Sequence, residues 1–585
     1  MNRFWGVVAV AMFVGAIAVM GQGGAMTQET PSQQGSSSVQ GIILPDIGTI
    51  SGSLQTDAQT SRYDAEIGAD TVRSGLLSST YFNLLFTRGK FTAGIRFESY
   101  QPPILGIDPR YGSSGDGTGL GIPYRFATYA DDVFEVTAGN FYEQFGSGMI
   151  LRTYEERNLG FDNSLDGLRL RFMPTAGLQL TGFIGRQRAF WDLSAGIMRG
   201  ADASADLKTM LGDALPDDMQ LSVGASVVSR YQADDQEVLK IPENVLAWST
   251  RANVMISDLS VDLEYAYKIN DPSATNKLSF NPGNALYLNA SWAGNGIGVN
   301  FATKRIDNMD FRSDRTAEGL VQQVNYLPAL TKQHTWRLIT LYPYATQPTG
   351  EFGMQGDVSF TIPKGSFLGD DETLVTLNAS VIHELDTTHV DAFTYDAKFG
   401  WDDRIYYRDV NIEITRKFGR DFKVTLAYIN LDYDKDIIER LASSSGTQFG
   451  VITANFAVVE LWFKLSKTNS LRTELQYMTT KQQPGTKLAP INGDWAMALV
   501  EYSISPHWIL TAFNELNFNS YKTLEDGSLQ EQTINYPSAQ VAYNTGALRV
   551  SGGYGRVRGG ILCVGGICRP VPASNGFTLS VMYSF

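Results

Sequence analysis

Two cysteines near the carboxyl end are the residues best placed for covalent chemistry. Cys563 and Cys568 flank a Val-Gly-Gly-Ile stretch, and the paired glycines permit a tight reversal that brings the two thiols together. A disulfide across so short a span would stiffen one loop and contribute about 2 kcal/mol or less. A pair this close fits an oxidising compartment, although a reduced pair or half of a metal site remains open. The stiffened loop, which carries Arg569, would plug a lumen or present a surface to a partner.

A series of closely spaced carboxylates suggests cation binding. Asp432, Asp434, Asp436 and Glu439 alternate with other residues in a stretch where a loop is expected. Alternating carboxylates can gather a hard cation such as calcium. The glycine that bends a calcium loop is absent, and Tyr433 and Lys435 interrupt the series, so a solvated loop is the competing interpretation.

The histidines give no catalytic pattern. The chain has four, His334, His383, His389 and His507, and none lies in a context that resembles the phospholipase or protease barrels of the outer membrane. His383 and His389 miss the helical spacing of a zinc motif and fall at the end of an expected strand. We therefore expect no enzyme, no catalytic residues and no cofactor.

The elements around these residues read as strands. In the last eleven residues, Phe577, Leu579, Val581, Tyr583 and Phe585 share one face, and small or polar residues share the other. A period of two with terminal aromatic residues is typical of a lipid-facing barrel strand. Residues 90–100, 259–268 and 471–478 repeat the pattern, with charges on one face only. Such strands predict a bilayer crossing with a wet interior.

Charges on the inward faces are the candidate pore-lining residues. The segment 139–188 is the densest, and its Arg169 and Arg171 lie opposite Leu168 and Leu170. They would steer anions, or form a salt-bridge ladder with Glu143, Glu155 and Glu156, which is the interpretation we favour. The signs are mixed, which predicts weak ion selectivity in an open pore. The full set is Arg96, Glu98, Arg169, Arg171, Asp262, Glu264, Arg337, Glu413, Lys423, Arg472 and Glu474.

The fold expected from these strands is all-β: one large up-and-down antiparallel transmembrane β-barrel over residues 47–585. Tight turns, such as Arg88-Gly89-Lys90 and Ser257-Asp258, alternate with long polar stretches. Placing every tight turn in the periplasm gives about 26 strands with both termini periplasmic. The least certain strands lie near residues 195–207 and 319–327, so the range is 22–26.

The N-terminal segment and the net charge indicate where the protein is located and which partners it can have. Residues 1–21 have the charged start, apolar core and small-residue end of a signal peptide, although an uncleaved anchor stays open. Residues 22–46 are expected to be a flexible periplasmic tail, too short for the plug domain of an energised transporter. A net charge of −14 disfavours nucleic acid as a partner. We expect an integral protein of the Gram-negative outer membrane. Its partners would be outer-membrane lipid and lipopolysaccharide, the barrel assembly machinery during biogenesis, and protein subunits of an outer-membrane complex.

Three segments carry a resemblance to a known family. Residues 139–188, Tyr342-Pro343-Tyr344-Ala345-Thr346-Gln347 and residues 563–576 resemble uncharacterised Bacteroidota-type outer-membrane barrel proteins of unknown function. The first segment also looks weakly similar to alginate-export and substrate-specific porins. The resemblance implies a location and a fold but no activity. The expected function is a porin-like conduit for solutes or a polymer, and the alternative is a scaffold subunit of an assembly or secretion complex with a loop-filled lumen.

Overall fold

A computed structural model describes residues 41–44, 47–234, 238–319, 321–366, 369, 371–439 and 447–585. The predicted signal peptide (1–21) and most of the predicted tail (22–46) lie outside these ranges. Within the tail, β1 (Ile42–Leu44) pairs with the beginning of the first barrel strand. No helix in the described ranges is both long and apolar enough to cross a bilayer.

Twenty-four antiparallel strands in the described part of the chain close into a β-barrel. The barrel strands are β2 (Gly48–Gln59), β3 (Leu77–Arg88), β4 (Phe91–Tyr100), β5 (Gly119–Ala130), β6 (Phe134–Phe141), β9 (Leu165–Thr175), β10 (Leu178–Ala189), β11 (Asp192–Asp206), β12 (Met219–Tyr231), β13 (Asn244–Ile256), β14 (Leu259–Lys268), β15 (Gly283–Gly294), β16 (Ile297–Asp307), β17 (Gly350–Ile362), β18 (Thr373–His389), β19 (Tyr395–Phe418), β20 (Phe422–Asp434), β21 (Val451–Lys464), β22 (Asn469–Gln482), β23 (Asp494–Ile504), β24 (Trp508–Thr523), β25 (Leu529–Thr545), β26 (Leu548–Val557) and β29 (Ser574–Ser584).

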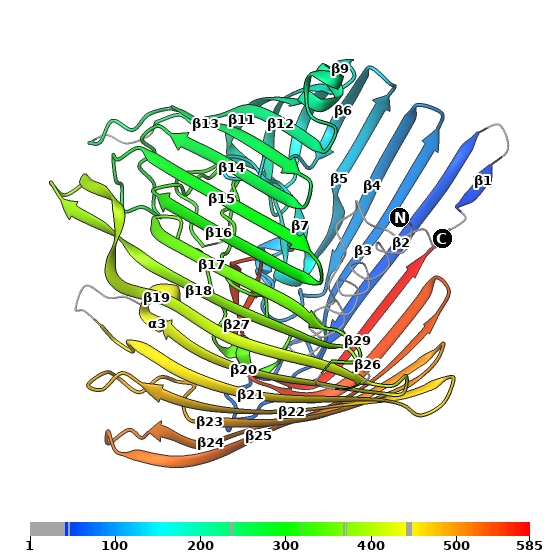
Figure 1. Cartoon of the computed structure of the whole chain (residues 1–585), viewed down its shortest axis with the longest axis vertical. Coiled ribbons are helices and arrows are strands. Elements are labelled where there is room, and N and C mark those ends of the chain that lie inside the picture. The colour runs from blue at the N-terminus through cyan, green and yellow to red at the C-terminus, as the bar shows by residue number, and fades with distance from the viewer. Residues whose placement is uncertain are drawn as a thin grey trace.

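The last strand closes the barrel on the first. β29 pairs with β2 in a register that sets Leu54 opposite Tyr583, and the adjacent ribbons can be followed in Figure 1. Closure satisfies the backbone hydrogen bonds of every strand, which a strand in lipid requires. The predicted all-β, up-and-down antiparallel barrel is therefore confirmed.

The strand count lies inside the predicted range of 22–26, two below the predicted figure of about 26. Of residues 195–207, one of the two uncertain places, all but the last belong to β11, and Leu207 begins the short helix α2 (Leu207–Leu211). Residues 319–327, the other, are not a barrel strand; they lie in the long connection between β16 and β17. β18 and β19 extend beyond their neighbours, so most of the long polar stretch 386–404 is strand.

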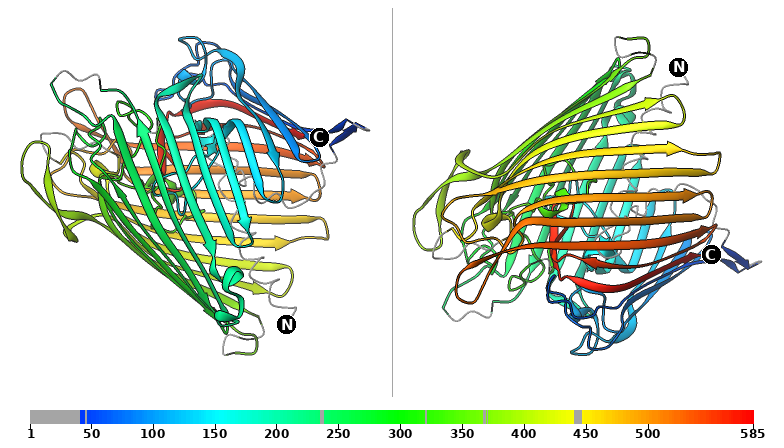
Figure 2. Two further views of the ribbon diagram at one scale, coloured as in Figure 1. Left: turned by 90° about the horizontal axis from the view of Figure 1, so that it is seen from above. Right: turned by 90° about the horizontal axis from the view of Figure 1, so that it is seen from below.

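The two ends of the barrel differ in their connections. Tight turns join β3 to β4, β13 to β14, β15 to β16 and β25 to β26, as predicted, and both the start of β2 and the end of β29 lie at the same end. We call this the short-turn end, which is periplasmic in barrels of this kind. The opposite, long-loop end carries the connections 60–76, 101–118, 142–164, 308–349 and 558–573. Figure 2 shows the short hairpins beside the carboxyl terminus and the larger loops at the far side.

The outer face of the wall is apolar. In β29, Phe577, Leu579 and Tyr583 are 64%, 46% and 44% exposed, as the alternation of the sequence predicted. Leu168 and Leu170 of β9 and Leu263 of β14 are similarly exposed. Large apolar side chains left uncovered on strand after strand suit hydrocarbon rather than water as the surrounding medium.

Candidate functional site

Three connections from the long-loop end fold into the lumen. They are residues 142–164, residues 308–349, and residues 558–573, which contain the hairpin of β27 (Gly560–Val564) and β28 (Ile567–Val571). Figure 1 shows β27 enclosed by the ribbons of the wall. We call these three segments together the plug, of which every residue except 320 is described.

The three segments contact one another directly. The backbone N–H of Tyr326 donates to the carbonyl of Gly148 at 2.9 Å, and its hydroxyl donates to the carbonyl of Gly565 at 2.9 Å. The N–H of Thr346 donates to the carbonyl of Gly566 at 3.2 Å. Both glycines have positive φ, at 58° and 83°, so the turn of the hairpin depends on the Gly-Gly pair that the sequence marked. Residues from three distant parts of the chain thus form one internal unit.

Apolar side chains fix the plug to the wall on two sides. On one side Ala247, Ala266 and Ala285 are fully buried inward-facing residues of β13, β14 and β15. Their small size leaves room for larger plug residues, of which Phe145, Met149, Ile150, Phe311 and Val324 are also buried. On the other side Leu338, Ile339 and Tyr342 of the plug pack in a cluster with Ile429, Leu431, Phe456 and Met478 of the wall. These clusters exclude water from the half of the lumen nearer the long-loop end.

Strand β20 shows how the inner face of the wall changes from polar near the short-turn end to apolar near the long-loop end. In its first half Leu426 and Tyr428 are exposed on the outer face, and Lys423 faces the lumen. In its second half the pattern inverts, because Ile429 and Leu431 are buried inside and Asp432 pairs with Arg408 at 2.6 Å outside. A polar outer face ends the hydrocarbon-compatible belt, so the second half of the strand rises above it.

Buried ion pairs supplement the apolar contacts. Arg337 of the plug lies 2.5 Å from Glu515 of β24, and Arg558 approaches the same carboxylate to 3.5 Å. A hydrogen bond of 2.6 Å also joins the His334 ring of the plug to Asp409 of β19, which is fully buried. Removing one partner of a buried ion pair such as Arg337–Glu515 leaves an unpaired charge where water is excluded, which costs about 3–5 kcal/mol.

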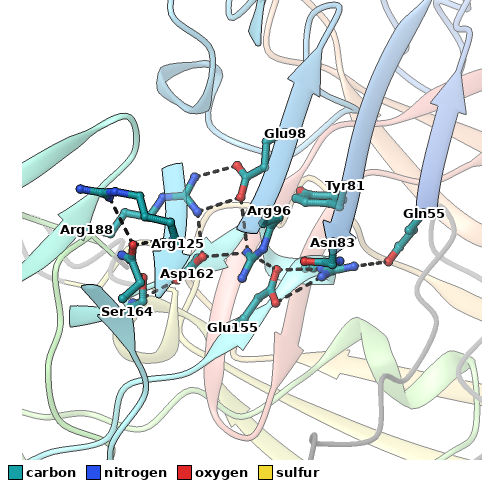
Figure 3. A network of polar contacts seen from close by, with 12 residues as sticks. Gln55, Tyr81, Asn83, Arg96, Glu98, Arg125, Glu155, Asp162, Ser164 and Arg188 are labelled. Atoms are coloured by element: carbon teal, nitrogen blue, oxygen red, sulfur yellow. Dashed lines mark hydrogen bonds and ion pairs between the residues drawn. The ribbon is translucent and has the colours of Figure 1, made fainter. Parts of the chain in front are cut away.

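Figure 3 shows the polar network that fixes residues 142–164 to the wall. Arg96 of β4 contacts Glu155 at 2.7 Å, Asp162 at 3.0 Å and Glu98 at 3.3 Å. Arg188 of β10 contacts Glu98 and Asp162, both at 2.7 Å. Burial alone would raise the pKa of Asp162, but Arg188 and Arg96 outweigh it and lower that pKa to about 2. Asp162 is therefore ionised at neutral pH and links Arg96 to Arg188.

Arg169 and Arg171 form the predicted salt-bridge ladder, with partly different partners. Both contact Glu143, at 3.5 Å and 2.9 Å, and both also pair with Glu135 of β6. Glu155, expected in this ladder, pairs instead with Arg96 and Arg157. Glu156 accepts from the N–H of Asn158 at 3.1 Å, and burial raises its pKa.

The other predicted pore-lining residues divide into two groups. Glu98, Glu264 and Glu474 are almost fully buried, and Glu264 accepts the N–H of Ser147 in the plug at 2.7 Å. Arg337, expected on the wall, lies in the plug instead. The remaining charges, joined by Arg251, lie nearer the short-turn end and are partly exposed. We call this second group the charged band: Arg171, Arg251, Asp262, Glu413, Lys423 and Arg472.

Exposure separates the charged band from the plug. The side chains of Arg171 and Glu413 are 30% and 29% exposed, whereas Lys304 and Glu351, an ion pair beside the plug, are 2% and 0%. Lys423 and Arg472 share Glu460 at 3.2 Å and 2.7 Å, so even here opposite charges alternate. The side chains of the band are therefore accessible to water.

The four carboxylates of the calcium prediction have separate protein partners. Asp432 pairs with Arg408, and Asp434 pairs with Arg404 at 2.8 Å. Asp436 accepts backbone N–H groups of residues 448–450, and Glu439 pairs with Lys435 at 2.6 Å. No group of three potential ligands suited to a metal ion occurs among the described residues. The structure therefore gives these side chains ion pairs and turn contacts in place of a shared cation.

The predicted disulfide is present. Cys563 and Cys568 are joined across the β27–β28 hairpin. Of the two roles left open for this loop, the structure shows the first, because the hairpin folds into the lumen. The contact of His334 with Asp409 has no counterpart in the sequence prediction, since 75 residues separate the two.

A family model described as a family of unknown function (DUF6029) matches residues 35–585. No curated protein matches the chain. Among solved structures, the siderophore receptor PirA from Pseudomonas aeruginosa aligns with TM-score 0.38 and 11% identity, over 92% of this chain and 80% of the receptor. The outer membrane transporter YddB from Escherichia coli gives 0.38 and 9%, over 91% and 80%. The outer membrane protein opdK from Pseudomonas aeruginosa gives 0.30 and 10%, over 70% and 97%. Likeness this low says nothing of a substrate.

Proposed function

The chain belongs to this family of unknown function (DUF6029), and from its own geometry we propose a restricted solute conduit of the outer membrane. The observation that supports this most is the charged band, whose side chains stay partly exposed inside a closed barrel. A lumen that served only as packing space would gain nothing from unburied charges on its inner wall. The proposal includes no catalytic step.

The plug supplies the restriction. It crosses the half of the lumen above the band, anchored on β13–β15 at one side and on β20–β24 at the other. A solute entering from the long-loop end would pass the plug before it reached the band. Because the band alternates in sign, ion selectivity is expected to be weak and size to matter more than charge.

A scaffold subunit of an outer-membrane complex is the second candidate. The dry clusters between plug and wall favour it, because they make the plug a fixed part of the barrel. A scaffold would use its outer loops and lipid-facing wall to hold other proteins. Lipopolysaccharide and the assembly machinery would be partners under either proposal.

Conductance of the purified full chain in a planar bilayer separates the two. The conduit proposal expects discrete single-channel steps with weak ion selectivity, and size-limited solute uptake in liposome swelling. A folded, inserted barrel that stays silent in both assays would overturn it. Silence together with proteins that co-purify in mild detergent would support the scaffold.

A further inference from the structure

Arg569 is a buried cation without an ionic partner. Its side chain lies on β28 inside the barrel and is 7% exposed. No carboxylate of the described residues lies within ion-pair distance of it. Its Nη2 donates to the carbonyl of Asn158, whereas Nε and Nη1 have no hydrogen-bond partner. An unpaired buried charge is costly, so this arginine needs an explanation.

The ion-pair network nearest to Arg569 is complete without it. The neighbouring network contains three arginines and three carboxylates that pair among themselves, and Arg110 nearby is paired with Asp108 at 2.6 Å. The carboxylate of Glu156 acts on Arg569 from beyond ion-pair distance, and burial raises the pKa of Glu156, so the guanidinium keeps two nitrogens without a hydrogen-bond partner. The network consists of Arg96, Arg157, Arg188, Glu98, Glu155 and Asp162.

A cavity of about 420 Å³ lies against this arginine. It is lined by residues 106–111, 159–163 and 188–190, by Glu318, Gly319, Val321 and Gln322 of the plug, and by Arg569 and Pro570. Ile107, Leu159 and Phe161 give it apolar walls. Gly106, at φ 84°, brings its backbone so close that a Cβ there would lie 2.7 Å from Nη1 of Arg569. The chain thus leaves room for the guanidinium at the edge of an apolar cavity.

We propose that this cavity binds a small organic carboxylate, with its apolar body against Ile107, Leu159 and Phe161 and its charge beside Arg569. A carboxylate would form an ion pair with the guanidinium and accept the hydrogen bonds that Nε and Nη1 do not make. The predominantly apolar walls favour a monoanion with a hydrocarbon or aromatic body over inorganic phosphate. Burial lowers the pKa of Arg569 to about 10, which leaves it charged at neutral pH.

The proposed site does not depend on passage through the lumen. The cavity is formed by loops of the long-loop end, and occupancy can be measured on a barrel that conducts nothing. Binding is therefore tested without conductance, so its failure and the failure of the conduit proposal are distinguishable.

The test uses 4-phenylbutyrate as the probe and calorimetric titration of the full chain in detergent. Its alcohol and amine analogues keep the body and change the charge, and acetate keeps the charge without the body. The expected result is saturable binding of the carboxylate, at least tenfold tighter than each of the three analogues. Equal binding of alcohol and carboxylate, or no binding at all, would overturn the proposal.

Two substitutions locate the charge. Arg569→Gln should weaken carboxylate binding at least tenfold, and Arg569→Lys should restore part of it. Arg73→Gln removes an arginine from an exposed loop at the same end of the barrel and should bind like the native chain. Each variant is first checked for the folded band on unheated gels. Native affinity in a folded Arg569→Gln barrel would refute the assignment of Arg569.

Discussion

The same strands build two unlike halves of the lumen. Near the long-loop end the inner wall is apolar or carries fully buried ion pairs, and the plug packs against it. Near the short-turn end the inner wall carries the charged band, with side chains up to 30% exposed. The difference lies in how closely the plug packs on the wall: it buries the inner face in the first half, whereas in the second half Arg171 and Glu413 contact only its Glu143 and Lys332 and stay partly exposed.

Because of this contrast, removing one partner of an ion pair should destabilise the two halves by different amounts. A buried pair beside the plug has lost its hydration, so removing one partner is expensive. A partly exposed pair in the band keeps water as an alternative partner, so removing it costs little. Matched substitutions in the two halves should therefore differ in size, and the predictions below follow that order.

The largest effect is expected for Glu515→Ala. It leaves Arg337 and Arg558 without their carboxylate and should loosen the docking of residues 308–349 by about 3–5 kcal/mol. Limited proteolysis should then cleave this segment much faster, and single-channel steps should grow. The control is Glu501→Ala, whose side chain is 21% exposed at 3.9 Å from Arg472 and should change cleavage little. Equal acceleration of cleavage by both substitutions would contradict the proposed difference between the two halves of the lumen.

The next largest effect is expected for shortening an apolar side chain between the plug and the wall. Leu338→Ala opens a cavity in the cluster between plug and wall, where Leu338 is fully buried, and should cost about 2–5 kcal/mol. Hydrogen exchange across 308–349 should accelerate. Leu475→Ala on the lipid-facing side of β22, where Leu475 is 54% exposed, should leave that exchange unchanged. Protection that persists in Leu338→Ala would show that apolar packing does not hold the plug.

Loss of the disulfide should have a smaller, local effect. Cys563→Ser with Cys568→Ser removes a short-span crosslink worth about 2 kcal/mol or less. Exchange should rise in residues 558–573 and remain slow in 142–164, which the arginine network holds. Faster exchange through all three segments would mean that the hairpin, rather than the wall, stabilises the plug.

The smallest effect on stability is expected in the charged band. Lys423→Gln removes one cation that pairs with Glu460 at 3.2 Å, at a cost of about 1 kcal/mol or less. If the lumen conducts, the reversal potential in a salt gradient should shift toward cation preference. A shift toward anions would contradict the placement of Lys423 on the solute-facing wall.

Sequence patterns predicted the wall well, because alternation is local. Residues 259–268 were expected as a strand and form β14, and the terminal strand closes on β2 as β29. The Gly-Gly pair between Cys563 and Cys568 likewise marked its hairpin and disulfide.

The plug could not be predicted in the same way. Two of its anchors, His334 with Asp409 and Arg337 with Glu515, join residues 75 and 178 positions apart. Its short extended pieces resemble strands, which is why residues 319–327 were counted with the wall. The expectation that apolar residues of a barrel strand face the lipid also fails beyond the lipid-facing belt, where Ile429 and Leu431 face the lumen.

Water access along one strand tests the division of the lumen most directly. On β16, Asn300 and Ile306 face the lumen; Ile306 is 1% exposed beneath the plug, and Asn300 lies six positions closer to the short-turn end. The native cysteines are joined and do not react with maleimides, so Asn300→Cys and Ile306→Cys each add one thiol. With a charged, membrane-impermeant maleimide, the account predicts fast labelling at position 300 and none at 306 in the folded barrel. Equal labelling of both thiols would contradict it.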